Sequence, residues 1–142
     1  MLRKVAEEFD KWAEDGLAQS MADGHADVAF QILDRLPFSS GLNVCDVGCG
    51  NGWLVREMMR RGAIRGYGFD ISPKMVSLAE DTTFSGAFFG VANAADLPLE
   101  SSSIDYLVSI ESLYYHFNPA DSLREWHRIL KKGGTLSFMV NL

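Results

Sequence analysis

An apolar segment at residues 42–47 runs directly into a turn with glycine at every second position, Gly48, Gly50 and Gly52. Glycine adopts backbone angles that other residues resist, so the chain can bend sharply here and a ligand can lie against the backbone. The amphipathic segment after the turn predicts a helix, whose free amide groups point back into the same space. The sequence therefore predicts a strand, a tight turn and a helix N-terminus that together bind a small molecule.

The rest of the chain alternates between predicted strands and helices. We expect strands at residues 42–47, 65–70, 87–91, 104–109 and 135–140, with helices at 52–61, at 73–81, and from Asn118-Pro119 to Gly133-Gly134. Such alternation is typical of an α/β fold with a doubly wound, mainly parallel sheet and helices on both faces. Ahead of it, residues 2–15 and 25–36 predict two helices, and residues 17–24 an irregular segment.

Length and composition indicate one cytoplasmic domain. The chain has 142 residues and a net charge of −6, with no long run of lysine or arginine, which argues against a nucleic-acid or membrane surface. The N-terminus has no signal-like apolar segment. Cys45 and Cys49 are the two cysteines, and neither a disulfide nor a metal site is expected from them. We expect residues 1–38 to form helices over the site and residues 42–142 to form its core.

Acidic residues follow the first two predicted strands. Asp70 ends the second strand, where a carboxylate can accept hydrogen bonds from both hydroxyls of a ribose. The glycine spacing differs from the dinucleotide fingerprint, and Asp46 would place a negative charge beside a pyrophosphate. A carboxylate at Asp46 fits a ligand with an ammonium group better. An NAD(P)-dependent oxidoreductase of related fold is the alternative that this comparison leaves open.

Four segments, in order, resemble motifs of the class I S-adenosylmethionine-dependent methyltransferases. They are the glycine turn at 44–55, the stretch 68–75 around Asp70, the stretch 93–105 with Asn93-Ala94 and Asp96-Leu97-Pro98, and the stretch 128–136. The resemblance implies a Rossmann-like sheet of order 3-2-1-4-5 and S-adenosyl-L-methionine as cofactor. It also implies transfer of a methyl group to a small-molecule acceptor.

The resemblance further implies roles for individual residues around the cofactor. Gly48, Cys49 and Gly50 would line its methionine part, and Asp46 would position its ammonium group. Asp70 would bind the ribose, and Ile71, Asn93 and Ala94 would contact the adenine. Ser109 and Ile110 would border the methionine and the methyl group.

Residues for the acceptor side are weaker candidates, and no catalytic base is named. Two regions come near the expected methyl position: the N-terminal helices, with Trp12 and His25, and the segment after the fourth strand, with Glu111, Tyr114 and His116. Methyl transfer from a sulfonium requires mainly alignment of the reacting groups, so a proton-transfer motif is not a requirement. The family's nucleic-acid amino-methylating motif is absent after the fourth strand.

The family's sheet has two further strands after the fifth, and this sequence ends at Leu142. We therefore expect a fragment of the full fold, or self-association through the exposed edge of the fifth strand. A non-catalytic subunit that binds cofactor or activates a partner is a further alternative.

Overall fold

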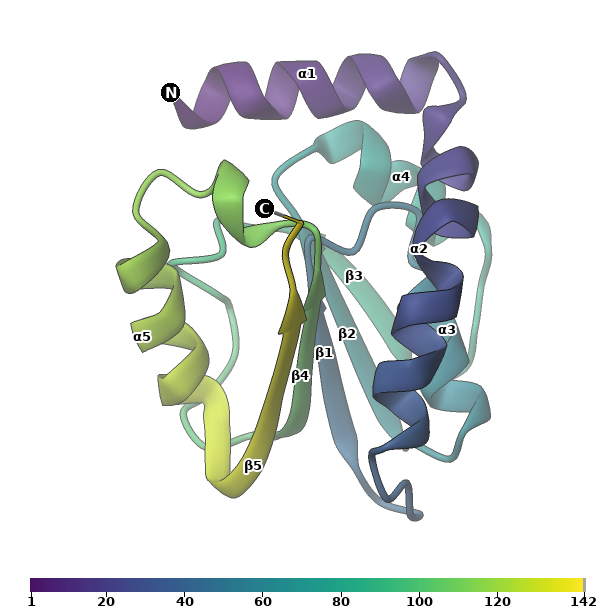
Figure 1. Cartoon of the computed structure of the whole chain (residues 1–142), viewed down its shortest axis with the longest axis vertical. Helices are drawn as coiled ribbons and strands as arrows, with labels where there is room; N and C mark the ends of the chain where they lie inside the picture. The colour runs from purple at the N-terminus through teal and green to yellow at the C-terminus, as the bar shows by residue number, and fades with distance from the viewer. Residues whose placement is uncertain (142) are drawn as a thin grey trace.

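A computed structural model describes residues 1–141 and contains one five-stranded sheet (Figure 1). The strands are β1 (Asn43–Val47), β2 (Arg65–Asp70), β3 (Ala87–Val91), β4 (Ile104–Ile110) and β5 (Leu130–Met139). Their order is β3-β2-β1-β4-β5, and every neighbouring pair is parallel. The predicted Rossmann-like sheet and its order are confirmed.

Helices connect and flank these strands. They are α1 (Leu2–Glu14), α2 (Leu17–Asp34), α3 (Trp53–Arg60), α4 (Pro73–Asp81) and α5 (Pro119–Ile129), with a 3₁₀ turn, η1 (Leu113–Tyr115), after β4. The start of α4 follows from its local sequence: Ser72 Oγ accepts a hydrogen bond from Met75 N at 3.1 Å, and Pro73 occupies the first helical position. The end of β2 is thereby followed directly by a capped helix.

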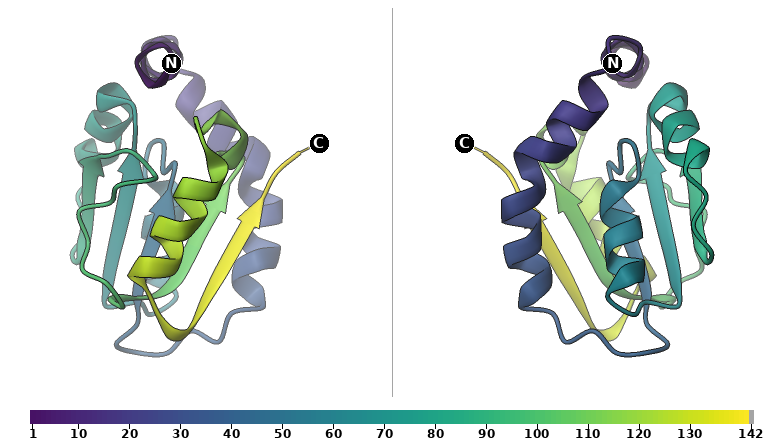
Figure 2. Two further views of the ribbon diagram at one scale, coloured as in Figure 1. Left: turned by 90° about the vertical axis from the view of Figure 1, so that its left-hand side faces the viewer. Right: turned by 90° about the vertical axis from the view of Figure 1, so that its right-hand side faces the viewer.

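Helices α2 and α3 cover one face of the sheet and α5 covers the other (Figure 2), and an apolar cluster lies between the helices and the sheet on each face. On one face, Leu33 of α2 and Leu54 and Met58 of α3 pack on Val44 and Val108. On the other face, Trp126 and Ile129 of α5 pack on strand residues including Cys45 and Leu107, together with Leu97 from the segment before β4. The predicted helices on both faces are confirmed, and β1 and β4 form the buried centre.

The irregular segment predicted at residues 17–24 is wrong, because α2 begins at Leu17. Gly16 adopts a left-handed conformation with φ of 75°, which separates α1 from α2. Ala18 and Ala22, one turn apart, are both buried, and Gln19 donates to Asp23 Oδ1 at 2.8 Å. Burial of these small side chains favours the helix despite Gly24 in the same stretch.

The predicted end of the last helix at Gly133-Gly134 is also wrong. Helix α5 ends at Ile129, and β5 begins at Leu130. Leu130 pairs with Ile104, and the register then shifts before Thr135 pairs with Tyr106. Gly133 has φ of 81° at this shift, so the two glycines mark an irregularity within the strand.

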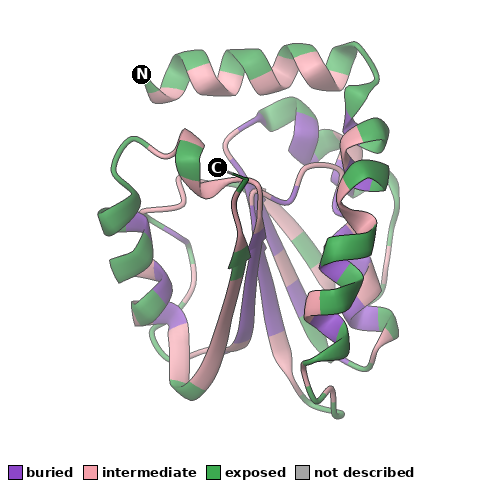
Figure 3. Ribbon diagram, viewed as in Figure 1, coloured by how far each residue is buried: buried purple, intermediate pink, exposed green. Residues whose placement is uncertain are grey.

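Helix α1 lies across the carboxyl ends of the strands and packs mainly on α4 (Figures 1 and 3). No side chain of α1, over Leu2–Glu14, is fully buried, although its apolar residues are partly covered. Among the described residues, none of the helices has the length and apolarity that crossing a membrane requires.

Leu33→Ala should lower the free energy of unfolding by about 2–5 kcal/mol, because it opens a cavity between α2 and the sheet. Leu17→Ala is the matched control: the same change on the same helix, at a side chain that is 42% exposed, should cost roughly 0.5 kcal/mol or less. Urea unfolding measures both. Equal shifts of the two midpoints would contradict the assigned packing of α2.

Candidate functional site

The glycine turn has the backbone conformation that its sequence predicts. Gly48, Gly50 and Gly52 all have positive φ, at 81°, 50° and 80°. The amide groups of Gly48 and Cys49 donate to the carbonyl oxygen of Phe69 at 2.8 and 3.0 Å, which ties the turn to the end of β2. A Cβ at Gly48 would lie 2.5 Å from Ser112 Oγ, whereas a Cβ at Gly50 would meet no described atom within 4 Å. Space for a ligand therefore lies beside Gly50.

Asp70 joins this turn to α4. Its Oδ2 accepts a hydrogen bond from Gly50 N at 2.9 Å, and its Oδ1 accepts one from Ser72 N at 3.0 Å. Burial raises the pKa of the Asp70 carboxyl, and the backbone hydrogen bonds from Ser72 and Gly50 act in the opposite direction. The carboxylate is held rigidly at the edge of the cavity, with its remaining lone pairs free to accept from a ligand hydroxyl.

Asp46 is a buried acid of the site with an incomplete set of hydrogen bonds. It is only 3% exposed, and its Oδ1 has no hydrogen-bond partner among the described residues. Burial, together with the charge of Asp70, raises the pKa of Asp46 to about 8. Within residues 1–141, no lysine or arginine lines the cavity that Asp46 faces. A ligand that brings a cationic group would supply the missing partner, so the residues present fit an ammonium.

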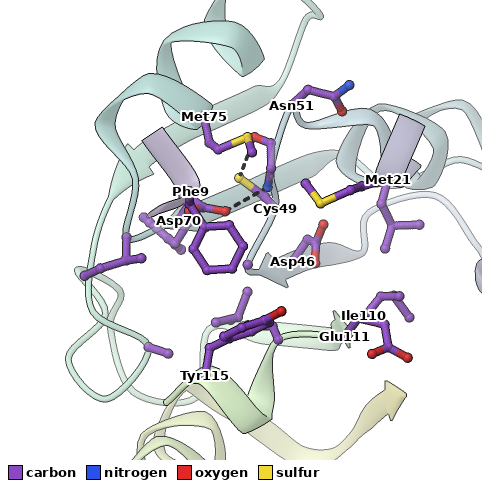
Figure 4. A pocket seen from close by; sticks show the side chains of 18 of the residues that line it. Phe9, Met21, Asp46, Cys49, Asn51, Asp70, Met75, Ile110, Glu111 and Tyr115 are labelled. Atoms are coloured by element: carbon purple, nitrogen blue, oxygen red, sulfur yellow. Dashed lines mark hydrogen bonds between the residues drawn. The ribbon is translucent and has the colours of Figure 1, made fainter. Parts of the chain in front are cut away.

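A cavity of about 1030 Å³, counted with its open mouth, lies over the carboxyl ends of β1, β2 and β4 (Figure 4). This is the edge of a parallel sheet at which α/β folds bind their ligands. Its floor is the glycine turn, and its roof comes from α1 and α2. The described part of the chain holds no group of three metal-ligating side chains.

The structure brings together the residues predicted to bind the cofactor, except one. Those that line the cavity are Asp46, Gly48, Cys49, Gly50, Asp70, Ile71, Asn93, Ala94 and Ile110. Ser109 is not in the lining, because its buried hydroxyl donates to the carbonyl oxygen of Val47 at 2.9 Å and fastens β4 to β1.

The segment at Asn93 and Ala94 is shaped by two hydrogen bonds. Asn93 Oδ1 accepts from Ala95 N at 3.0 Å, so one lone pair of its amide oxygen is already used. The buried Trp126 indole donates to the carbonyl oxygen of Ala94 at 3.2 Å. Burial raises the pKa of the Cys49 thiol and disfavours a thiolate, which agrees with a packing role for this residue.

The acceptor-side candidates divide into two groups. His25, Glu111 and His116 line the cavity, whereas Trp12 and Tyr114 do not. Trp12 packs edge-on against Phe9, with ring centroids 4.9 Å apart. Tyr114 is 49% exposed, and its hydroxyl donates to Glu111 Oε2 at 2.9 Å.

Two aromatic residues that the sequence did not single out face each other across the cavity (Figure 4). Phe9 of α1 and Tyr115 of η1 make an edge contact, with ring centroids 5.0 Å apart, and both belong to the lining. Val5 and Phe9 lie one helical turn apart on the same face of α1, but the partner of this face depends on tertiary structure.

His116 forms a polar pair with Ser112 inside the cavity. Ser112 Oγ lies 3.0 Å from His116 Nε2, and His116 Nδ1 is buried without a partner in the described chain. Burial lowers the pKa of His116, so the imidazole is neutral at neutral pH. A neutral imidazole can accept a proton, which keeps His116 among the candidates for contact with an acceptor.

Comparison with known proteins gives one family. A model described as a methyltransferase domain matches residues 45–138. The 27-O-demethylrifamycin SV methyltransferase of Amycolatopsis mediterranei is 31% identical over 75% of this chain and 41% of its own length. The chain spans about half the length of the curated relatives it matches.

Solved structures agree with this result. A chain of the complex between the Haloferax volcanii Trm112 methyltransferase activator and a methyltransferase is 40% identical, with a TM-score of 0.90, over 94% of this chain and 60% of that one. An S-adenosylmethionine-dependent methyltransferase from Mesorhizobium loti is 34% identical, with a TM-score of 0.67, over 72% of this chain and 48% of that one.

The buried Asp46 should make the folded protein less stable as the pH rises. Between about pH 4 and pH 8 the folded chain keeps a proton on Asp46 that the unfolded chain has lost, so the unfolding free energy falls across this window. Asp46→Asn should remove up to about 1.4 kcal/mol of this fall per pH unit. Urea unfolding at pH 5, 6, 7 and 8 measures the difference.

Asp70 and His116 titrate in both proteins, so the difference between the two slopes belongs to Asp46. Asp27→Asn, which changes an exposed acid on α2, is the control and should keep the wild-type slope. A slope for Asp46→Asn equal to that of the wild type would show that Asp46 is ionised in the folded protein.

Proposed function

This chain belongs to the family of S-adenosylmethionine-dependent methyltransferases, and we propose that it binds this cofactor and transfers its methyl group to a small, largely apolar acceptor. The observation that carries the proposal is the pair of buried carboxylates, Asp46 and Asp70, on either side of the open space at Gly50. One suits an ammonium group and the other suits a ribose.

We assign the cofactor's contacts to residues that line the floor of the cavity. Asp46 would bind the ammonium, the backbone of the glycine turn would lie along the methionine part, and Asp70 would accept from the ribose hydroxyls. Ile71 and Asn93 would flank the adenine. When bound, the cofactor would supply an activated methyl group, and these residues would hold it on the floor of the cavity.

The chain's own contribution to the reaction is alignment. An in-line displacement needs the acceptor atom, the methyl carbon and the sulfur on one axis, and fixing that geometry accounts for much of the rate. His116, Glu111 and His25 line the space where the acceptor would enter. An acceptor that must lose a proton would find the neutral imidazole of His116 there.

The lining of the roof supports an apolar acceptor without phosphate groups. The apolar side chains of Leu2, Val5 and Phe9 from α1 and Met21 from α2 line the roof, and Tyr115 of η1 lies against Phe9. The charged side chains that line the cavity within residues 1–141 are acidic, so an anionic substrate would meet repulsion and no cation. The relative from Amycolatopsis mediterranei acts, by its name, on 27-O-demethylrifamycin SV.

The two alternatives drawn from the sequence lead to different ligands or outcomes. A dinucleotide would bring its pyrophosphate near the buried Asp46. Among the described residues, no lysine or arginine lines the cavity there to offset the charge of the pyrophosphate. A non-catalytic subunit would bind the cofactor in the same way without transferring its methyl group.

S-adenosylhomocysteine should bind the purified chain, and NADH should not. Asp70→Ala should weaken the binding at least about tenfold, because a buried carboxylate that accepts ribose hydrogen bonds contributes roughly 1.5–3 kcal/mol. Isothermal calorimetry measures both ligands. Asp105→Ala, which changes an acid that faces Asn43 and Lys131 away from the cavity, is the control.

NADH binding without S-adenosylhomocysteine binding would overturn the proposal in favour of the oxidoreductase. Binding of S-adenosylhomocysteine with no methyl transfer to a broad panel of apolar hydroxyl, amine and carboxylic acid acceptors would favour the non-catalytic subunit.

We also propose that the free edge of β3 binds an activator protein through an added strand. Phe88 and Val91 on this strand are 54% and 51% exposed, and the solved chain with 40% identity is in a complex with the Trm112 methyltransferase activator. An unpaired, uncharged strand edge is a ready site for β-strand addition. Self-association through β5, where Phe138 is 46% exposed, is the competing prediction.

Haloferax volcanii Trm112 is a suitable probe for this surface. We expect it to form a one-to-one complex with the wild-type chain in light scattering, and Phe88→Asp to weaken that complex by at least about tenfold. Phe138→Asp on the other edge strand is the matched control and should bind normally. A dimer of the chain alone that Phe138→Asp disrupts would support self-association through β5.

A further inference from the structure

We propose that Asp10 is a positioning residue that latches α1 over the cofactor site and thereby limits how fast cofactor and product exchange. The proposal rests on the proposed function, since the ligand concerned is the cofactor. It adds a residue outside the cavity lining and a step, opening of α1, that precedes ligand entry and release.

The latch is a set of hydrogen bonds between α1 and the N-terminus of α4. Asp10 Oδ1 accepts from Ser72 Oγ at 2.5 Å and from Lys74 N at 3.1 Å. A carboxylate at a helix N-terminus is stabilised by the free amide groups and the helix dipole. Glu14, one turn further along α1, forms an ion pair with the Lys74 side chain. Asp10 and Glu14 therefore converge on the first turn of α4.

The rest of α1 is weakly fastened. Within Leu2–Glu14 no side chain is fully buried, and an isolated helix of this length is marginally stable in water. Gly16, with φ of 75°, separates α1 from α2 and supplies a natural pivot. Segments with little buried apolar surface are those that open at low free-energy cost. The latch is therefore a large part of what holds α1 in place.

The latch lies directly against the ribose-binding position. Ser72 donates its amide to Asp70 Oδ1 and its hydroxyl to Asp10, so the same residue touches both carboxylates. Phe9, next to Asp10 in sequence, lines the cavity and contacts Tyr115 on the opposite wall (Figure 4). With Asp10 latched, Phe9 closes the cavity above the glycine turn, and opening of α1 breaks both contacts.

A latch changes rates more than affinity. If exchange requires α1 to open, Asp10→Ala should raise the association and dissociation rate constants of S-adenosylhomocysteine together. We expect a rise of about tenfold or more, as loss of a hydrogen bond to a charged group implies. The dissociation constant should change by less than about threefold, because both rates depend on the same opening equilibrium.

Stopped-flow fluorescence can follow this exchange, since Trp12 lies on α1 and packs against Phe9. Glu7→Ala is the matched control: it removes an acid from the same helix, and the partner of Glu7 is Arg3 within α1. Asp10→Asn keeps an accepting oxygen without the charge. The two rate constants of Asp10→Asn should lie between those of the wild type and those of Asp10→Ala. This variant separates the hydrogen bonds of Asp10 from the effect of its charge on Asp70.

Wild-type rates in Asp10→Ala would overturn the latch, and so would a faster dissociation without faster association. Amide hydrogen exchange in the ligand-free chain tests the same contact independently of binding. Exchange across α1 should be faster in Asp10→Ala than in Glu7→Ala. If S-adenosylhomocysteine fails to bind the wild type, the proposed function fails; equal exchange in the two variants would still reject the latch.

Discussion

The structure of the site depends on one set of backbone contacts, those between the glycine turn and the end of β2. The amides of Gly48 and Cys49 donate to the carbonyl of Phe69, and the amide of Gly50 donates to Asp70. Together they fix where two neighbouring strands end relative to each other. A side chain at Gly48 would collide with Ser112, so even the segment after β4 is positioned by the shape of this turn.

The same contacts bring two buried acids, Asp46 and Asp70, close to the glycine turn. Asp70 is compensated by backbone amides, whereas Asp46 has a buried oxygen with no partner among the described residues. Burying such a group lowers stability unless something neutralises it. In the free protein the raised pKa of Asp46 keeps the group protonated up to about pH 8. A cationic group placed beside it would favour the ionised form, so recognition of an ammonium would be coupled to loss of this proton.

Local chemistry explains which features could be predicted from the sequence. Gly48, Gly50 and Gly52 require positive φ, Ser72-Pro73 caps a helix, and Asp70 ends a strand, so each indicates its structure without knowledge of its neighbours. The segment at residues 17–24 and the strand around Gly133 depend instead on tertiary packing and sheet register. The resemblance implies a place for Ser109 beside the cofactor, but it does not indicate that its hydroxyl bonds to Val47 in the neighbouring strand.

The floor and the roof of the cavity are therefore held by different means. The floor is part of the sheet and its buried clusters, and its conformation follows from the central strands. Much of the roof is α1, which contributes Phe9 but no fully buried residue, and polar contacts from Asp10 and Glu14 hold it to α4. A floor fixed by the fold suits a constant cofactor, whereas a roof held by a few surface contacts can change its side chains or its position at little cost to stability. Side chains of the roof can thus vary without disturbing the glycine turn.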